Sequence, residues 1–358
     1  MKAEDTLCVI YGKEGFESGI LWRCAADYLC GALKEAGFCE IERAETQAQA
    51  RMTEGRCVLA LRSDVVPDMK DIIRLTENFD GEAALLRLPD GSEAGFIAEG
   101  RREPAEFDRS ETIGCERGFL AAASEYERFA LTQRLNRENI IRLMESGVRF
   151  KSTDGILICP GAVIGEGSEI LPGTIIKGGV VIGKNCVIGA NTVMEDSEAG
   201  DGCVINASQI YSSRIGKNVR IGPFAHIRPN CRIGDGVKIG DFVELKNSVI
   251  GEGTSVAHLT YVGDSDVGRR VNFGCGCVTV NYDGRVKSRT VIGADVFVGC
   301  NSNLVAPVKL GDGSYIAAGS TVTDAVPEDA LAIARARQVV KDGWAKRRRE
   351  NGQTKETK

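Results

Sequence analysis

The second half of the chain repeats an aliphatic residue at every sixth position. The repeat runs through three segments, whose aliphatic positions are Ile158, Ile164, Ile170, Ile176, Ile182 and Ile188; Ile215, Ile221, Ile227, Ile233, Ile239 and Leu245; and Ile292, Val298, Leu304, Leu310, Ile316 and Val322. A period of six fits neither an amphipathic helix nor an alternating strand. It fits a coil with flat sides, in which each hexad makes a short strand and a corner and the aliphatic side chain points inward. The repeat therefore predicts a left-handed parallel β-helix over residues 156–326.

Two segments interrupt this repeat. One lies between positions 279 and 292, in the sequence VNYDGRVKSRT, and the other lies between positions 194 and 213. Glycine is abundant, with 43 residues concentrated in the second half, where corners call for positive φ. Because loops that leave a rigid scaffold commonly carry function, we expect functional residues near the segment at 279–292.

The first half is a different kind of sequence. Apolar strands at 7–11, 58–61 and 84–88 alternate with helical stretches at 20–35 and 69–77, which is typical of an α/β, Rossmann-like domain. The turn Gly12-Lys13-Glu14-Gly15 lacks the spacing of a phosphate-binding motif, so we interpret it as a plain turn. The predicted division is an α/β domain at 1–120, a helical linker at 121–150, the all-β left-handed β-helix at 151–327 and a C-terminal arm at 328–358 with a basic helix at 339–350.

Composition excludes several classes of partner. A formal net charge of -5 argues against broad nucleic-acid binding. No apolar run approaches the roughly 18 residues that cross a bilayer, and the N-terminus does not resemble a secretory signal, so we expect a cytoplasmic protein. Thirteen scattered cysteines without a C-x-x-C pair predict small buried hydrophobic residues rather than a zinc site.

The segment from Pro223 to Lys287 holds the candidate chemistry. The chain has two histidines, His226 and His258, which excludes a three-histidine metal site within one chain but not one shared between chains. His258 lies beside a glycine-rich coil and shortly before the interrupting loop, where an imidazole is suited to take a proton from an amine. Three cations with few carboxylate neighbours in sequence predict an anion site that fits a sugar phosphate: Arg228, Lys246 and Lys287.

Several motifs from about residue 147 to residue 344 carry a resemblance. They read IGPFAHIRPN, KIGDFVELKNS, AHLTYVGDSDVG, VNFGCGCVTVNYDG, VGCNSNLVAPV and IAAGSTVTDAVPEDALAIARARQ. This part closely resembles the acetyltransferase domain of the bacterial bifunctional N-acetylglucosamine-1-phosphate uridyltransferase/glucosamine-1-phosphate N-acetyltransferase. The resemblance implies a homotrimer with active sites between subunits. It also implies transfer of acetyl from acetyl-CoA to glucosamine 1-phosphate, without a metal, for UDP-N-acetylglucosamine and cell-wall precursor synthesis.

The resemblance also implies roles for individual residues. His258 matches the general base, and the backbone N–H of Cys275 matches the donor to the tetrahedral oxyanion. Positions that match holders of the sugar phosphate are Arg228, Lys246, Tyr261 and Lys287, and those around the amino sugar and acetyl group are Asn272, Asn281 and Tyr282. Positions that match acetyl-CoA contacts are Cys275, Cys300, Ala318 and Arg335. Cys275 and Cys300 stand where some family members have Ala and Ser.

The first half departs from the family. The uridyltransferase domain is about twice as long and opens with a loop carrying Gly-Thr-Arg-Met, whereas this chain reads VIYGKEGFES there. Asp64 loosely matches a metal-binding Asp, but Tyr126 stands where the second magnesium ligand, an Asn, is expected. A nucleotidyl transfer site without these parts should be inactive, so we expect a degenerate domain without uridyltransferase activity.

Three alternatives remain at this point. The acceptor can be another amino-sugar phosphate. A β-helical carbonic anhydrase would need three zinc-binding histidines. The chain can also be a non-catalytic scaffold or regulator whose first domain has decayed.

Overall fold

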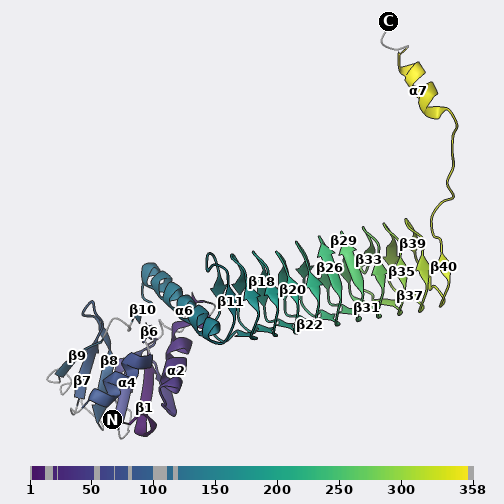
Figure 1. Cartoon of the computed structure of the whole chain (residues 1–358). Helices are drawn as coiled ribbons and strands as arrows, with labels where there is room; N and C mark the ends of the chain where they lie inside the picture. The colour runs from purple at the N-terminus through teal and green to yellow at the C-terminus, as the bar shows by residue number, and fades with distance from the viewer. Residues whose placement is uncertain are drawn as a thin grey trace. The chain divides into compact units, whose positions relative to one another are not determined.

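The computed structural model describes residues 2–12, 19–21, 23–51, 57–67, 69–79, 83–99, 111–115 and 120–353. The chain divides into two compact units, Met1–Gly202 and Cys203–Lys358. Figure 1 shows the helices and strands of both with their labels. The division between the units lies inside the hexad repeat, so each unit contains coils of the β-helix. No described helix is both long enough and apolar enough to cross a membrane.

The first unit begins with a six-stranded mixed sheet. Its strands are β4 (Glu40–Ala44), β1 (Thr6–Tyr11), β5 (Cys57–Arg62), β8 (Glu93–Glu99), β7 (Ala83–Arg87) and β9 (Glu111–Gly114), in that spatial order. β1 is parallel to β4 and β5, whereas β8 is antiparallel to β5 and β7. With the helices α2 (Ala25–Glu35), α3 (Gln47–Arg51) and α4 (Met69–Asn78), this sheet confirms the predicted α/β class.

Two predicted helices begin later than expected. The stretch predicted as helical from 20 to 35 starts as a helix only at Ala25, because β2 (Gly19–Ile20) and β3 (Arg23–Cys24) first pair as an antiparallel ladder. The basic helix predicted at 339–350 is α7 (Trp344–Gln353). The first half also contains elements that were not predicted: the strands β4, β8 and β9, the helix α3, the 3-10 helix η1 (Ala3–Asp5), and the paired strands β6 (Val65–Val66) and β10 (Leu120–Ala121). Residues 13–18, which include most of the predicted turn after Gly12, lie outside the described residues.

The helix α6 (Glu125–Glu145) joins the sheet to the first coils of the same unit. It begins with a capping box, in which the Ser124 side chain accepts from the Glu127 N–H and the Glu127 carboxylate accepts from the Ser124 N–H. Along its length, buried Asn136 donates to the Ile156 carbonyl at 2.7 Å and accepts from the Ile158 N–H at 2.9 Å. These bonds attach the helix to the start of the β-helix.

Parallel two- and three-residue strands form the coils of the first unit. The strands fall into three sheets: β11 (Arg149–Phe150), β14 (Glu169–Ile170) and β17 (Val187–Ile188); β12 (Leu157–Ile158), β15 (Ile175–Ile176) and β18 (Val193–Glu195); and β13 (Val163–Ile164), β16 (Val181–Ile182) and β19 (Glu198–Ala199).

The second unit is also a three-sided coil of parallel strands. Its first sheet holds β20 (Val204–Ile205), β23 (Arg220–Ile221), β26 (Lys238–Asp241), β29 (Ser255–His258), β32 (Asn272–Phe273), β35 (Phe297–Val298), β38 (Tyr315–Ile316) and β40 (Leu331–Ala332). Its second sheet holds β21 (Gln209–Tyr211), β24 (His226–Ile227), β27 (Glu244–Lys246), β30 (Tyr261–Gly263), β33 (Val278–Val280), β36 (Asn303–Val305) and β39 (Thr321–Val322). Its third sheet holds β22 (Arg214–Ile215), β25 (Arg232–Ile233), β28 (Val249–Ile250), β31 (Ser265–Val267), β34 (Thr290–Ile292) and β37 (Val308–Leu310).

The hexad positions form the core of these coils. All eighteen aliphatic residues of the predicted repeat are buried, with exposed fractions of 6% or less. Each stacks on its equivalent in the next coil, as Ile221 pairs with Ile239 and Val298 pairs with Ile316. The left-handed parallel β-helix predicted from the sequence is confirmed.

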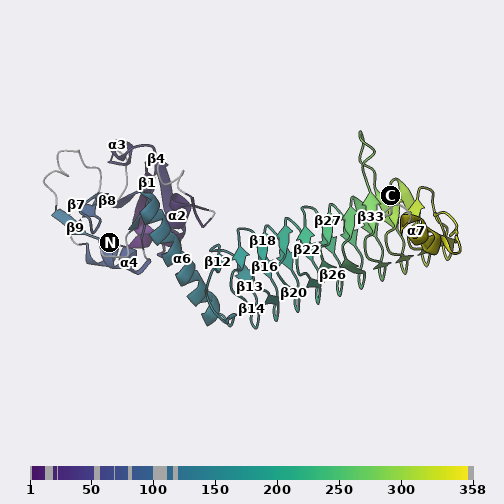
Figure 2. The same ribbon diagram turned by 90° about the horizontal axis from the view of Figure 1, so that it is seen from above.

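The interruption at 279–292 is a loop that leaves the coil. Val267 pairs with Ile250, 17 positions earlier, but with Ile292, 25 positions later. The extra residues lie between β33 and β34, and Figure 2 shows this loop projecting from the coil beside β33. The loop is tied at its base, where the Ser288 N–H donates to the Asn281 carbonyl at 2.9 Å.

Candidate functional site

The predicted site residues gather at two corners of the coils in the second unit. We call the corner between the first and second sheets the histidine corner; its stacked positions are Asp241, His258, Cys275, Cys300 and Ala318. We call the corner after the second sheet the lysine corner; its residues are Arg228, Lys246, Asn247, Gly263, Asp264 and Asn281. Each corner is built by the register of the parallel strands.

A hydrogen-bonded pair occupies the histidine corner. His258 ends β29 and pairs in register with Asp241 at the end of β26, and His258 Nδ1 lies 2.7 Å from Asp241 Oδ1. Both side chains are exposed to solvent. The hydrogen bond with His258 lowers the pKa of Asp241 below its ordinary value, so the aspartate is ionised at neutral pH. Because a carboxylate only accepts hydrogen bonds, Nδ1 carries the proton that is donated to Asp241, and in a neutral ring the lone pair is therefore on Nε2.

The predicted acetyl-CoA positions stack on the next coils of the same corner. Val256, Phe273, Val298 and Ile316 pair in register, so the residues two positions further on also stack: His258, Cys275, Cys300 and Ala318. Bonds from Asn301 N to the Cys275 carbonyl and from Gly319 N to the Cys300 carbonyl, both 2.8 Å, connect these turns. Arg335 follows at the next coil, and its Cδ lies 3.7 Å from the position of a Cβ added to Gly319. The structure therefore brings together at one corner all the residues that were predicted to contact acetyl-CoA.

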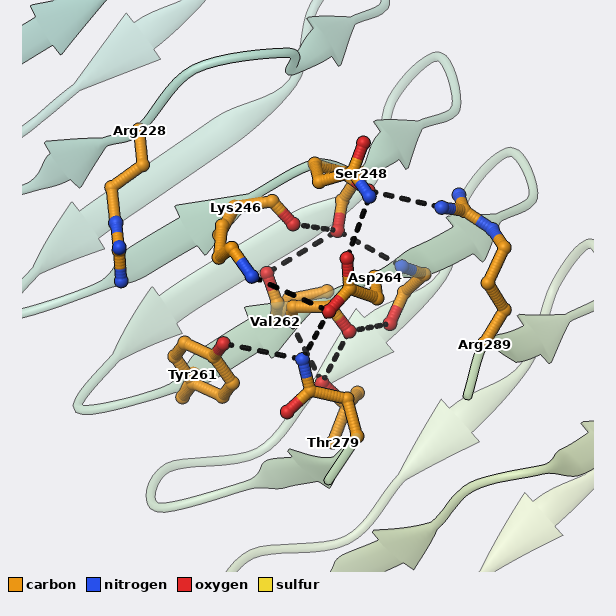
Figure 3. A network of polar contacts seen from close by, with 12 residues as sticks. Arg228, Lys246, Ser248, Tyr261, Val262, Asp264, Thr279 and Arg289 are labelled. Atoms are coloured by element: carbon orange, nitrogen blue, oxygen red, sulfur yellow. Dashed lines mark hydrogen bonds and ion pairs between the residues drawn. The ribbon is translucent and has the colours of Figure 1, made fainter. Parts of the chain in front are cut away.

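The lysine corner is organised around the buried carboxylate of Asp264. Asn247 donates to Oδ1 at 2.6 Å, Asn281 donates to Oδ2, and Lys246 Nζ lies 3.5 Å from Oδ2 (Figure 3). Burial raises the pKa of Asp264, but the hydrogen bonds from Asn247 and Asn281 and the charge of Lys246 outweigh it, so its pKa lies below the ordinary value. Asp264 thus holds the Lys246 ammonium and the base of the projecting loop together.

Tyr261 reaches the lysine corner across a glycine. A Cβ added to Gly263 would lie 2.2 Å from the Tyr261 hydroxyl oxygen, so the absence of a side chain at Gly263 makes room for the ring. The Asn281 amide lies 3.4 Å from this hydroxyl. Figure 3 shows Tyr261 and Lys246 on neighbouring strands, with the ammonium and the hydroxyl turned toward Asp264.

Two arginines, Arg228 within this corner and Arg289 beside it, are each paired with a carboxylate. Arg228 follows β24 one step after the Ile227–Leu245 register pair, so it stands beside Lys246, and its Nη1 donates to Glu244 Oε1 at 2.8 Å. Arg289 binds Asp266 through two hydrogen bonds of 3.0 and 2.5 Å. The Arg228 side chain remains partly exposed in its pair with Glu244, so other N–H groups of the guanidinium are accessible to an anion.

The projecting loop carries the remaining predicted substrate contacts. Tyr282 and Lys287 form an isolated antiparallel bridge across it, and both side chains are exposed. The Tyr282 hydroxyl donates to the Gly284 carbonyl at 2.7 Å, and the Asp283 carboxylate accepts from the N–H groups of Arg285 and Val286.

One predicted substrate residue lies away from the lysine corner. Asn272 is exposed on the first sheet, in register with Ser255 and three positions before Cys275. Its strand therefore leads into the histidine corner.

Three residues that structure these corners were missed by the sequence reasoning: Asp241, Asp264 and Gly263. The signal was present for Asp241, which precedes His258 by 17 positions, the length of the local coil. Counting one coil back from the histidine would have found it.

In the first unit, Asp64, the residue that loosely matches a metal-binding aspartate of the family, is part of an ion pair. Asp64 is buried, and both of its carboxylate oxygens accept from Arg62, at 3.0 and 2.6 Å. Among the described residues, no group of three or more His, Cys, Asp or Glu side chains gathers in a form that could hold a metal ion. Tyr126, at the second compared position, is exposed on α6.

Comparisons with known proteins agree with this architecture. Residues 161–196, 212–247 and 289–324 match the family described as bacterial transferase hexapeptide (six repeats). The coils and their hexads thus define a protein with the hexapeptide-repeat transferase fold.

The particular relatives of the chain are bifunctional GlmU proteins. It is 64% identical over 157 residues to the bifunctional protein GlmU of Thermoanaerobacter pseudethanolicus, covering 44% of this chain and 34% of that protein. It is 45% identical over 267 residues to the bifunctional protein GlmU of an Exiguobacterium species, covering 73% of this chain and 56% of that protein. The chain therefore spans about a third to somewhat more than half the length of these relatives.

Among solved structures, a UDP-N-acetylglucosamine acyltransferase from Arabidopsis aligns with a TM-score of 0.44 at 19% identity, over 55% of this chain and 75% of that one.

Proposed function

We propose that this chain is an acetyltransferase that moves the acetyl group of acetyl-CoA to the amine of glucosamine 1-phosphate. The observation that carries the proposal is the Asp241–His258 pair at the head of the stack formed by Cys275, Cys300 and Ala318. This pair places a proton-accepting imidazole on the coil next to the residues that were predicted to contact acetyl-CoA. The 64% identity to a bifunctional GlmU protein over 157 residues supports the proposal.

In this mechanism His258 acts through Nε2. The lone pair on Nε2 removes a proton from the attacking ammonium or amine, and the imidazolium that forms is stabilised by Asp241 through Nδ1. Asp241 is therefore a positioning residue that fixes the tautomer and the orientation of the ring. In the described part of the chain the Cys275 N–H donates to no acceptor, which leaves it available to the oxyanion of the tetrahedral intermediate.

The lysine corner binds the sugar phosphate in this proposal. Lys246, Arg228 and Lys287 supply positive charge, and the Tyr261 hydroxyl supplies a hydrogen bond. Phosphate oxygens are well matched to an arginine fork and a lysine ammonium in a partly dry site. Asp264 restrains Lys246 so that less side-chain entropy is lost when the anion binds.

The two corners imply an assembly of several chains. The amine and the phosphate of glucosamine 1-phosphate lie on neighbouring ring carbons, yet a side of the coil separates His258 from Asp264 within one chain. A second copy can supply the missing corner. An exposed apolar ridge beside the histidine corner favours such contact: Phe224, Phe242 and Leu259 are 60%, 58% and 57% exposed and all have positive φ.

This ridge supports association between copies, and we propose that the assembly is the homotrimer that the family resemblance implies. Bulky residues in left-handed backbone conformations cost roughly 1–2 kcal/mol each, and large exposed apolar patches mark association surfaces. Phe224 and Phe242 stack with ring centroids 5.5 Å apart, so they already form a continuous surface. Association through the ridge would put the histidine corner of one chain beside its neighbour.

We further propose that the first unit has no uridyltransferase activity. A metal ion at Asp64 would have to displace the bidentate Arg62 guanidinium from a buried carboxylate. The expected outcome with UTP, magnesium and N-acetylglucosamine 1-phosphate is therefore no UDP-sugar. Magnesium-dependent formation of UDP-N-acetylglucosamine would refute this part of the proposal.

The main test measures thiol release from acetyl-CoA with glucosamine 1-phosphate, glucosamine 6-phosphate and free glucosamine as acceptors. We expect rapid release with the 1-phosphate alone. Rapid release with another amino-sugar phosphate would identify that compound as the acceptor. Release with none of the three would favour a non-catalytic scaffold. In the active protein, His258→Ala should lower turnover by about 10²–10⁴-fold with the oligomeric state unchanged. Near-normal turnover in that variant would remove His258 from the mechanism.

A further inference from the structure

Three cysteines meet on the two coils that follow His258. Cys275 and Cys277 flank Gly276 on one coil, and Cys300 lies on the next coil in register with Cys275. The thiols are close enough that both Cys275 and Cys300 contribute to the pKa of Cys277. No other part of the described chain places two solvent-accessible cysteines at the same register position of neighbouring coils.

Cys275 and Cys300 are the two accessible members of this group. Cys300 is exposed and Cys275 is half-buried. Cys277 is buried, its thiol donates to the Gly299 carbonyl at 3.2 Å, and burial raises its pKa to about 11. Because the thiolate is the reactive form, Cys277 is held in its unreactive state.

The geometry of the pair suits a covalent bond. Neighbouring strands in a sheet lie about 4.8 Å apart, and a disulfide needs its Cα atoms about 4.4–6.8 Å apart. The Cys300 side chain also leans toward the coil of Cys275, because its Sγ lies 2.9 Å from the position of a Cβ added to Gly274. Gly274 immediately precedes Cys275, so the absence of a side chain there leaves room for the sulfur to approach.

We propose that Cys275 and Cys300 form a reversible disulfide that closes the acetyl-donor end of the histidine corner. The oxidant is a low-molecular-weight disulfide, and the effect on catalysis rests on the proposed acetyl-CoA site. The Cys300 thiolate attacks one sulfur of this disulfide and releases one thiol. The Cys275 thiolate then attacks the Cys300 sulfur and releases the second, so two protein thiols become one disulfide and the oxidant becomes two thiols.

The bond would act on the donor directly. Cys275 and Cys300 stand between His258 and Ala318 in the stack, and the Cys275 N–H is the proposed oxyanion donor. A disulfide between these two side chains removes the free thiols that were predicted to contact acetyl-CoA. It also shifts the turn that presents the Cys275 N–H. Coenzyme A is itself a thiol, so its disulfide is a suitable oxidant at this corner, where we propose that acetyl-CoA binds.

The test starts from the reduced full-length protein treated with CoA disulfide or with oxidised glutathione. After alkylation of the remaining thiols, trypsin should release residues 271–285 and 290–309 as one linked species that has lost two hydrogens. Fragmentation of this species should place the bond at Cys275 and Cys300. A bond at Cys277, or separate peptides with both thiols alkylated, would overturn the proposal.

Activity measurements test the consequence. Acetyl transfer by the oxidised protein should fall at least about tenfold and return after treatment with a dithiol reductant. Cys275→Ala and Cys300→Ser should each lose this sensitivity, with every variant compared with its own reduced form. Cys39→Ser, which removes an exposed thiol in the first unit, should keep it.

The result also separates this inference from the proposed function. If both corner variants remain as sensitive as the unmodified chain, the disulfide does not regulate the site. A reduced protein without acetyl transfer that still yields the linked peptide would refute the proposed function and leave the disulfide in place.

Discussion

Replacing Asp264 by Asn removes the charge that organises the lysine corner while keeping the shape of the side chain. Asp264 is buried and accepts from Asn247 and Asn281, with Lys246 Nζ 3.5 Å away. An Asn in its place turns one acceptor into a donor, so one of the two amides faces another N–H group. Losing one hydrogen bond to a charged group and leaving a buried donor unpaired should cost about 3 kcal/mol locally.

Hydrogen exchange on the loop measures this cost. The reporters are the N–H of Ser288, which bonds to Asn281, and the N–H of Thr290, which bonds to the Asp264 carbonyl at 3.2 Å. About 3 kcal/mol corresponds to roughly 100-fold less protection in Asp264→Asn. Asp266→Asn is the matched control, because it removes a carboxylate that is 48% exposed in its pair with Arg289, and such pairs contribute about 0–1 kcal/mol. Equal loss of protection in both variants would show that burial at Asp264 does not decide its contribution.

Three further predictions address other parts of the chain. The lowered pKa of Asp264 means that its contribution is present above the ordinary carboxyl range and is lost as pH falls through the lowered value, so the exchange difference between the protein and Asp264→Asn should disappear in acid. Asn136→Ala leaves two backbone groups unpaired and should lower the unfolding free energy of the first unit by about 3 kcal/mol in urea, whereas exposed Gln133→Ala should change it by less than about 0.5 kcal/mol. Gly263→Ala should displace the Tyr261 ring and raise KM for the acceptor several-fold with kcat kept; an unchanged KM would contradict the role given to this glycine.

The hexad positions show how much of the fold followed from local information. A side chain such as Ile221 is buried because every sixth residue points inward, so the period alone identifies the core. The first half carried less information, because β4 (Glu40–Ala44) is largely exposed and has no apolar pattern to reveal it. The helix predicted from residue 20 likewise begins only at Ala25, because the residues before it pair as the strands β2 and β3, and a helical period does not reveal such strand pairing.

The site was predictable in its residue types and incomplete in its supporting contacts. The motifs picked out His258 and Lys246, to which we assign the proton transfer and the phosphate contact. Their partners Asp241 and Asp264 lie 17 and 18 positions away in sequence and come close only because one turn of the coil has that length.

The sequence by itself determined the β-helix, the place where the loop leaves it and the residue types of the candidate site, because these depend on a short repeat and on motifs within a few residues. Only the tertiary structure decided that the candidate residues divide between two corners, with His258 on one and Lys246 on the other. It also decided that Cys275 and Cys300 lie in register on neighbouring coils. The physical reason is that parallel strand register stacks residues one coil apart, so the number of residues in each turn, which varies along this chain, sets which side chains meet.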